Sequence, residues 1–414
     1  MKKFNGIKYL LIDIANTFGY DKLIWEERID KALAIIDSIT DEKGEYIKEE
    51  LLKLANSADE PAHCLSALLA YKDALKSIPS GHLIGLDATA SGPQILGIIT
   101  EDLNACKLTN TINSGKRVDM YKDIYEKVQA RLGNKLNITR DHVKESIMQR
   151  CYGGTATAKK YFGDYVDVFE EVMAEEIPNV WQFNQLALDM WDDTVSEYNW
   201  VMPDNFHVNM QVMDKVYTDF NYKGQDYTFI HNENQPRKRG LALGANITHS
   251  IDGFINREMF SRCMFNPEIK KLLNLNANSG KNSNSYYNHP KTQKLLDLID
   301  LYHESGYLSA RVLDYLDENT IGFLLNSDLV KVIDLIKSLP EKPFDLLSIH
   351  DCFRCHANYG NDVREQYKNC LVELAKSDML QFLLRQITGS NDITYVKDEP
   401  ELYKKIEDEE YAIC

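Results

Sequence analysis

Residues 139–154 read TRDHVKESIMQRCYGG, and this stretch guides the interpretation of the whole chain. Residues four apart lie near one face of an α-helix. One such stripe consists of Arg140, Lys144, Met148 and Tyr152, with two cations at one end and an aromatic ring at the other. At about 1.5 Å per residue the stripe is about 18 Å long, enough to run from a triphosphate to a base. The threonine before it is a typical N-cap, and helix N-termini attract phosphate. The same stripe also suits a surface helix with two solvated cations, so the surrounding sequence must decide.

Two aspartates stand where strands are expected to end. Asp87 follows the apolar run 83–86 and precedes a turn of small residues and a second apolar run, which predicts a strand, a tight turn and a helix. Asp351 interrupts the apolar run 344–353, as at the tip of a β-hairpin. A lone aspartate at such a place is usually a turn former or a helix cap. Two of them, with a phosphate-binding helix between, supply the oxygen ligands and cations that two-metal phosphoryl transfer needs.

These segments resemble polymerase motifs A, B and C of the single-subunit RNA polymerases of bacteriophages and mitochondria. The resemblance is carried by Asp-x3-Ser-Gly-x-Gln at 87–94, Arg-x3-Lys-x3-Met-x3-Tyr-Gly at 140–153 and His-Asp at 350–351. The sequence NITHSIDG at 246–253 is similar to the element that joins fingers to palm in this family. Weaker likeness begins at about residue 10, so the motifs occur in the family's order along most of the chain.

The resemblance implies a role for each matching residue. Asp87 and Asp351, with the backbone of Ala88, would bind two Mg²⁺ ions, and Lys144 and Tyr152 would act with these aspartates in catalysis. The implied nucleotide-binding residues are Arg140, Lys144, Met148, Tyr152, Gly153, Ser91, Gly92 and His249. Residues expected to support the site or contact nucleic acid are Gln94, His350, Arg237, Lys238 and Arg239.

The choice between ribose and deoxyribose depends on other positions. DNA polymerases of the same right-hand shape usually carry a glutamate in the first motif, which closes off the 2′ position, and an aromatic residue where Met148 stands. The first motif here, with Ser91 and Gly92, leaves that space open. By the resemblance, Tyr152 and His249 should select the ribose. The sequence therefore predicts an RNA polymerase, with two alternatives: a DNA polymerase or primase of the same superfamily, and an inactive interaction subunit that retains the fold.

The expected architecture is α+β: a right-hand palm with an antiparallel sheet and mainly helical fingers. The expected division is 1–115 for the first part of the palm, 116–245 for the fingers, 246–261 for their junction, 262–340 for a helical insertion and 341–414 for the second part of the palm with the C-terminal tail. Helices are predicted at 26–38, 61–76, 291–304, 308–317 and 326–338. We expect a shortened form of the family's promoter-reading hairpin at 205–240. We also expect a disordered acidic tail after residue 407, with a segment related to the family's C-terminal foot as the alternative.

The likeness begins within the first twenty residues, so the family's N-terminal promoter region and thumb are expected to be absent from this chain. A smaller polymerase subunit would then supply both, as in the split, heterodimeric middle-gene polymerase of certain bacteriophages, whose large subunit this chain resembles. A mis-called start codon is the alternative. The net charge of −16 is unfavourable for gripping nucleic acid, which favours a basic partner. The expected template is single-stranded DNA or a pre-melted promoter, opened by an accessory DNA-binding protein, with RNA as the product.

Composition is typical of an intracellular enzyme. The 414 residues are 44% hydrophobic, yet no apolar run approaches the roughly 20 residues that a membrane-spanning helix needs, and no signal-peptide pattern begins the chain. We therefore expect a cytoplasmic protein, in the host cell if the chain is phage-encoded, with no membrane partner and with free thiols at its eight cysteines. The sequence CFRCH at 352–356 has the spacing of a haem attachment site and of half a zinc site. Neither an export signal nor a second ligand pair accompanies it, so its cysteines are interpreted as small residues in and beside a strand.

Overall fold

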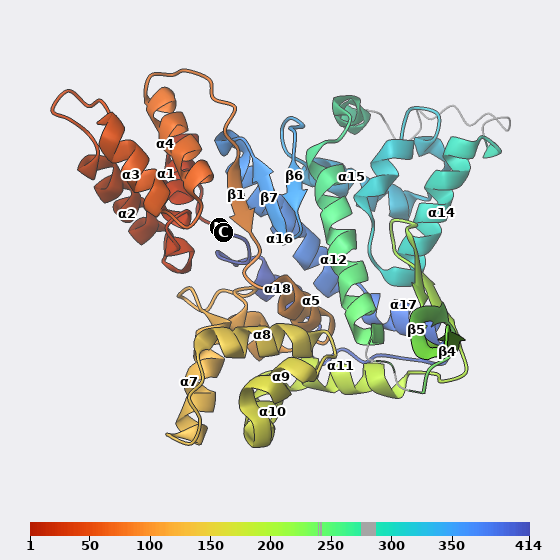
Figure 1. Ribbon diagram of the computed structural model, residues 1–414. Helices are drawn as coiled ribbons and strands as arrows, with labels where there is room; N and C mark the ends of the chain where they lie inside the picture. The colour runs from red at the N-terminus through yellow and green to blue at the C-terminus, as the bar shows by residue number, and fades with distance from the viewer. Residues whose placement is uncertain (239, 241, 275–286) are drawn as a thin grey trace.

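The structure, a computed structural model, describes residues 1–238, 240, 242–274 and 287–414. Over these residues helices predominate, and three small antiparallel sheets have the strand orders β1-β7-β6, β2-β3 and β4-β5 (Figure 1). This mixture confirms the predicted α+β class. None of the helices in these ranges has the length and apolar character needed to cross a bilayer.

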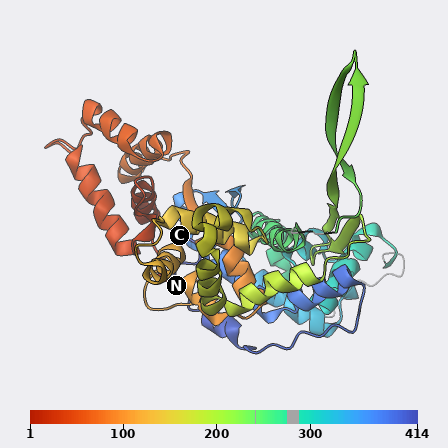
Figure 2. The same ribbon diagram turned by 60° about the horizontal axis from the view of Figure 1, so that its bottom comes forward.

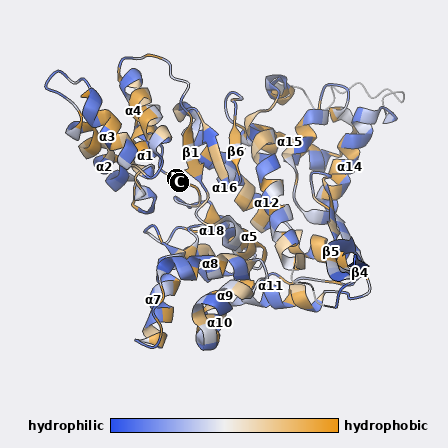
Figure 3. Ribbon diagram, in the orientation of Figure 1, coloured by the Kyte–Doolittle hydropathy of each residue, from blue (hydrophilic) through white to orange (hydrophobic). Residues whose placement is uncertain are grey.

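The central sheet joins segments from the two ends of the chain. Its strands are β1 (Ile84–Asp87), β7 (Cys352–Cys355) and β6 (Leu347–Ile349). Asp87 lies opposite Cys352, and Ile349 lies opposite the same Cys352 on the other side, so a two-residue turn connects β6 to β7. The predicted strand and hairpin are therefore confirmed. Helix α5 (Ser91–Ile99) is buried at every position and packs with α12 (Ala242–Cys263) and α16 (Gly360–Lys376). Hydrophobic residues gather around this sheet and α5 in Figure 3.

Helices flank the sheet on two sides. The N-terminal group consists of α1 (Gly6–Asn16), the short 3-10 turn Tyr20–Lys22, α2 (Trp25–Ser38), α3 (Lys48–Ser57) and α4 (Pro61–Leu75). The lower group in Figure 1 consists of α6 (Leu103–Leu108), α7 (Met120–Leu132), α8 (Arg140–Cys151), α9 (Ala156–Phe162), α10 (Val166–Glu176) and α11 (Pro178–Asp189). Helix α8 begins as predicted, because Thr139 Oγ1 accepts a hydrogen bond from the backbone of His142 at 3.3 Å.

The region 205–240 contains a hairpin, as predicted. After the small sheet of β2 (Glu197–Val201) and β3 (His207–Gln211), strands β4 (Met213–Tyr222) and β5 (Gln225–Asn234) form a ribbon of ten residue pairs that projects from the molecule (Figure 2). Lys223 and Gly224 make its turn with φ of 52° and 80°, the left-handed pair that favours a tight hairpin. The side chains of this ribbon point alternately to its two faces, as in any β-strand.

The predicted insertion forms a separate apolar cluster. Its elements are the 3-10 helix Pro267–Asn274, α14 (Pro290–Ser305), the 3-10 turns Ala310–Tyr315 and Ile321–Phe323, and α15 (Asn326–Ser338). Leu295, Val332 and Ile336 are fully buried in its own core. The three helices predicted here are confirmed, the middle one as a 3-10 helix, because their apolar residues recur at helical spacing. The loop predicted at 276–285 lies outside the described residues.

The C-terminal segment is ordered, so the expected disordered tail is wrong. After α17 (Met379–Thr388) and α18 (Leu402–Ile406), Ala412, Ile413 and Cys414 are buried, and Ile413 pairs with Ala88 in an antiparallel bridge. Burial of these apolar residues against the central sheet outweighs the acidic character of the preceding residues.

Glu409→Gln is expected to stabilise the fold above neutral pH. Burial, which Arg364 and Lys368 only partly offset, raises the pKa of Glu409 from its ordinary 4.5 to about 7. An acid whose pKa is raised by folding stabilises the fold while it is protonated, and this contribution is lost as pH rises from 4.5 through 7. Glutamine retains the oxygen that accepts from Ala412 N at 2.9 Å and cannot ionise. Urea unfolding at pH 8 should show a gain on the order of 2 to 3 kcal/mol, shrinking toward pH 5. The exposed Glu407→Gln is the control, and equal effects at both positions would contradict the assignment.

Candidate active site

The central sheet brings the two predicted metal-binding aspartates together. Asp87 ends β1, and Asp351 stands in the turn before β7, where its carbonyl accepts a hydrogen bond from Ala88 N at 3.2 Å. His350, with φ of 56°, forms the other half of the turn. Asn256 of α12 fixes the turn, because its side chain donates to His350 O at 3.0 Å. The backbone thus holds both aspartates and Ala88 at one end of the sheet.

Acidic groups crowd this end of the sheet. Burial, together with the charge of Asp351, raises the pKa of Asp87 to about 6, and Lys144 only partly opposes this. Burial and the same Asp351 charge raise the pKa of Asp252 on α12 to about 6. Because bound divalent cations relieve repulsion between carboxylates and prefer oxygen ligands, these residues suit the Mg²⁺ ions that the sequence predicted. Asp252 is a third candidate ligand that the sequence analysis missed, although it lies in the quoted NITHSIDG motif.

A cavity of ≈410 Å³ opens beside Asp87, large enough for a nucleotide. Predicted site residues on its wall are Asp87, Ala88, Arg140 and Lys144. Residues on its wall that the sequence analysis did not single out include Asp13, Asp21, His63, Arg117, Asp119, Tyr121, Arg354 and Cys414. The cavity wall therefore carries both carboxylates and cations, the groups that a metal-bound polyphosphate requires.

Helix α8 presents the predicted cations to this cavity. Arg140 donates to both oxygens of Asp119, at 3.0 and 2.9 Å. Arg140 and Lys144 also lie over the ring of Tyr121, at 5.5 and 5.7 Å from its centroid. Burial would raise the pKa of Asp119, but its hydrogen bonds with Arg140 outweigh burial and lower it. Asp119 and Tyr121 orient the two cations, and nothing in the sequence alone indicated these contacts.

The sugar-selecting residues of the prediction also meet. Tyr152, which caps the C-terminus of α8, lies 4.5 Å from His249 between ring centroids. A methyl group on Gly92 would stand 2.7 Å from Tyr152 Oη, so the phenol occupies space that only glycine leaves open. Burial raises the pKa of Tyr152 to about 12, and the phenol is therefore protonated and able to donate at neutral pH. Ser91 is buried beside Gly92, Gly153 follows Tyr152 with φ of 77°, and Met148 is 43% exposed on the same helix.

The remaining predicted residues lie elsewhere. Gln94 is fully buried; it donates to Thr109 O at 3.0 Å and to Ala412 O at 2.8 Å and accepts from Tyr367 Oη at 3.0 Å, so it supports the C-terminal segment. Arg237 lies 3.6 Å from Asp214 at the base of the β4-β5 ribbon, and Lys238 is exposed nearby. Neither lines the cavity. Arg239 lies outside the described residues.

The C-terminal residue is part of the site. Cys414 N donates to Asp87 O at 2.9 Å, and Asp87 N donates to Cys414 O at 3.3 Å. Arg28, fully buried, donates to the Cys414 thiol at 3.4 Å. Burial alone would raise the pKa of this thiol, but Arg28 and Arg117 outweigh it and lower the pKa. The segment after residue 410 therefore acts as an extra edge strand beneath Asp87.

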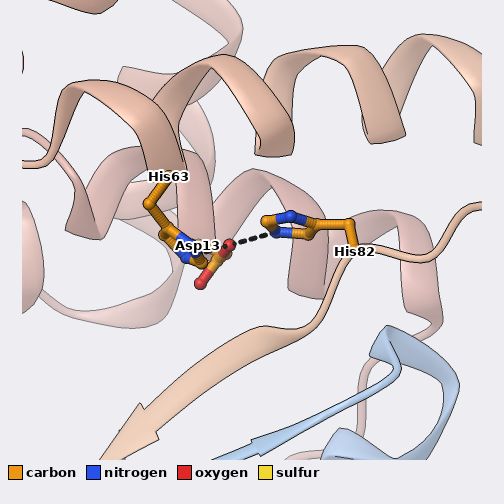
Figure 4. Close-up of side chains that lie close together, drawn as sticks. All are labelled: Asp13, His63 and His82. Atoms are coloured by element: carbon orange, nitrogen blue, oxygen red, sulfur yellow. Dashed lines mark hydrogen bonds and ion pairs between the residues drawn. The ribbon is translucent and has the colours of Figure 1, made fainter.

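A second cluster borders the same cavity, because Asp13 and His63 both line it. Figure 4 shows Asp13 with His63 and His82, whose ligand atoms all lie within 4.8 Å of one another. In the described part of the chain this is the one group of three such side chains at metal-binding distances, and it includes neither Asp87 nor Asp351.

Known RNA polymerases are similar to this chain in sequence. Residues 3–183, which include Asp87 and all of α8, match the family described as DNA-dependent RNA polymerase. The mitochondrial DNA-directed RNA polymerase of Neurospora crassa is 26% identical over 195 residues, 42% of this chain and 13% of that protein. A probable DNA-directed RNA polymerase of Neurospora crassa is 25% identical over 389 residues, 85% of this chain. The chain spans 38% of that second relative's length. By these matches and its motifs, the chain is similar to the single-subunit DNA-dependent RNA polymerases of phages and mitochondria.

Proposed function

We propose that this chain is the catalytic subunit of a DNA-directed RNA polymerase, which joins ribonucleoside triphosphates through two Mg²⁺ ions bound by Asp87, Asp351 and the Ala88 carbonyl. The observation that carries the proposal is the meeting of both aspartates at one end of the sheet, with Asp87 on the wall of the cavity that Arg140 and Lys144 of α8 also line. The raised pKa of Asp87 and Asp252 marks an excess of buried negative charge, which a bound cation would neutralise. When bound, the ions supply an activated 3′-hydroxyl and neutralise charge on the transferring phosphate.

The protein's own groups bind and orient the nucleotide. Arg140 and Lys144 face the cavity and would hold the triphosphate, with Asp119 keeping Arg140 in place until the phosphate arrives. We assign Tyr152 and His249, whose ring centroids lie 4.5 Å apart, to the sugar, with the Tyr152 phenol in the space beside Gly92. Met148 and Gly153 complete the surface on which the base would rest.

Tyr152→Phe is expected to weaken discrimination against deoxyribonucleotides. The protonated phenol is the available donor for a network that senses the 2′-hydroxyl, and its loss removes selection while leaving the metal ligands in place. We expect the ratio of kcat/KM for ribo- over deoxyribonucleotides to fall by about tenfold, the value of one hydrogen bond. The measurement is single-nucleotide addition with matched ATP and dATP. The neighbouring Tyr161→Phe, on α9, is the control, and an unchanged ratio in Tyr152→Phe would remove this residue from sugar selection.

The proposal includes a second, smaller subunit. We assign residues 1–115 and 341–414 to the palm, 116–245 to the fingers, 246–261 to their junction and 262–340 to an insertion. We propose that the promoter region and thumb come from a smaller subunit, as in the split middle-gene polymerases of bacteriophages, in the cytoplasm of the host. The net charge of −16 supports a basic partner, and it also favours single-stranded or pre-melted DNA with an accessory DNA-binding protein.

The test is nucleotide addition on a primed single-stranded DNA template by the purified chain, alone and with its co-purified partner. We expect Mg²⁺-dependent addition of ribonucleotides by the complex and weak activity of the chain alone. A preference for deoxyribonucleotides would favour the DNA polymerase or primase alternative. Absence of any addition by the native complex would favour an inactive subunit and overturn the proposal.

A further inference from the structure

Arg354 is a cation of the cavity that no sequence motif identified. It lies on β7 directly opposite Gly85 of β1, two register pairs from the pair of Asp87 with Cys352. Residues two apart on a strand share a face, and directly opposite residues share it too, so Arg354 and Asp87 lie on the same face, about 7 Å apart along the strand. All four of these residues line the cavity.

A chain of hydrogen bonds holds the Arg354 guanidinium in place. Its Nη1 lies 3.1 Å from His63 Nδ1, and His63 Nε2 lies 3.0 Å from Asp13 Oδ2. A guanidinium only donates, so His63 Nδ1 accepts and the histidine proton resides on Nε2, facing the carboxylate. Asp13 is buried in α1 and also accepts from the backbone of Gly85 at 2.9 Å. The relay thus ties the guanidinium to the strand that carries Asp87.

His82 completes the support for Asp13. Its Nε2 lies 2.8 Å from Asp13 Oδ2, and its Nδ1 lies 2.9 Å from Ser66 Oγ (Figure 4). Burial opposes ionisation of Asp13, but the hydrogen bonds with His63 and His82 outweigh burial and lower its pKa. Asp13 is therefore an anion, which is the form that both histidines need as their acceptor.

The same three side chains also have the composition of a transition-metal site. To bind a metal through Nε2, His63 would have to move its proton to Nδ1, where it would face the donors of Arg354. Two hydrogen-bond donors, His63 Nδ1–H and the Arg354 guanidinium, would then face each other beside a fixed positive charge. The contacts of Arg354 therefore favour a hydrogen-bonded relay over a metal centre.

The Arg354 guanidinium has donors left for a ligand. Among the described residues its buried Nε has no hydrogen-bond partner, and Nη2 has as its ion-pair partner only the largely exposed Glu60, at 4.0 Å. Gly85 opposite has no side chain, so the guanidinium has an open surface toward the cavity, with Cζ 3.9 Å from where a Cβ would be. A planar guanidinium with unused N–H groups in such a cavity matches a phosphate oxygen.

We propose that Arg354 binds a backbone phosphate of the strand that carries the attacking 3′-hydroxyl, and that His63 and Asp13 position it. The inference rests on the proposed polymerase function and assigns a binding residue to it. Figure 1 shows β1 running toward α5 and α8; Asp87 ends this strand, and the pair of Gly85 with Arg354 lies two residues before that end. In phosphoryl transfer the attacking and leaving oxygens lie in line on opposite sides of the phosphorus. We assign Arg140 and Lys144 to the triphosphate on the leaving side. Arg354 is then the cation for the nucleic-acid strand on the attacking side.

The test compares Arg354→Ala and Arg354→Lys with a matched control, Arg131→Ala, which removes a surface guanidinium of α7 that pairs with Glu175. The ligand is a primed DNA template with an RNA primer, measured by fluorescence anisotropy with the full chain in its native complex. We expect Arg354→Ala to raise Kd by about tenfold or more and to reduce the slope of log Kd against log salt by about one, with a smaller effect in Arg354→Lys. Arg131→Ala should leave Kd unchanged.

Neutral methylphosphonate links, placed singly at the last three positions of the primer, locate the contact. One of them should weaken binding to the wild-type protein by the same factor as Arg354→Ala and should weaken binding to that variant no further. His63→Gln should weaken wild-type binding by a smaller factor and have no added effect in the Arg354→Ala background, which a merely structural role would not produce. If each of the three methylphosphonate links weakened binding by the same factor in the wild type and in Arg354→Ala, the proposal would be overturned.

Three further results distinguish failure of the Arg354 assignment from failure of the proposed polymerase function. If the variants raise KM for the incoming nucleotide and leave Kd for the primer unchanged, Arg354 belongs to the triphosphate site and the proposal is wrong. If one equivalent of a transition metal co-purifies with the complex and is lost in His63→Gln, the relay is wrong. A wild-type complex that binds the primed template but adds no nucleotide would instead refute the polymerase function, while the binding measurements would still decide the role of Arg354.

Discussion

Asp87→Asn and Asp351→Asn should each reduce kcat for nucleotide addition by about 10³-fold or more while the chain remains folded. Each change removes one negative ligand from a site whose main role is to hold cations at the transferring phosphate, and that role accounts for several kcal/mol of the barrier. Asparagine preserves the shape of each side chain, and the backbone pairing of β1 with β7 does not depend on either carboxylate. Loss of Asp87 also relieves a buried charge whose pKa is already raised to about 6, so the variant should be at least as stable as the wild type.

The measurement is single-turnover nucleotide addition at saturating Mg²⁺, with circular dichroism to verify folding. Asp345→Asn, an exposed aspartate just before β6, is the matched control and should retain full activity. A near-normal rate in either active-site variant would exclude these aspartates as metal ligands and with them the two-metal proposal.

Removal of residues 411–414 should reduce activity by about 100-fold and lower the stability of the fold. The segment pairs with the backbone of Asp87, and the buried amide of Gln94 donates to its Ala412 carbonyl. Tyr411 stacks on Trp25 with ring centroids 5.2 Å apart. Without these contacts Asp87 would lose its fixed position, and a displacement of about 1 Å can cost a factor of about 10². Loss of the buried Ile413 and its neighbours should lower the unfolding free energy by about 3 kcal/mol or more.

The truncated chain is compared with the full chain by nucleotide addition and by urea unfolding. Asp408→Ala, an exposed change just before the segment, is the control for simple loss of acidic charge. A truncated chain with the activity and stability of the full chain would show that the paired segment does not position Asp87.

The sequence alone predicted the local elements that carry the motifs. Helix α8 with its Thr139 cap, the strand ending at Asp87 and the hairpin turn at His350 and Asp351 were all predicted, and the structure has them. Local signals suffice here, because helical and strand periodicity and capping act within a few residues. The helices of the insertion were predicted for the same reason.

Only the tertiary structure decided which residues surround these motifs. The last residues were expected to be disordered, because acidic composition says nothing of a buried partner on another strand. The electrostatic effect of Asp351 on Asp252, the bonds of Asp119 with Arg140, and the series from Arg354 through His63 to Asp13 join separate segments of the chain. Such contacts depend on strand register and helix packing, which no single stretch of sequence encodes. The motifs and helix caps therefore follow from the sequence. The charged side chains that orient the motif residues are brought to them by the fold.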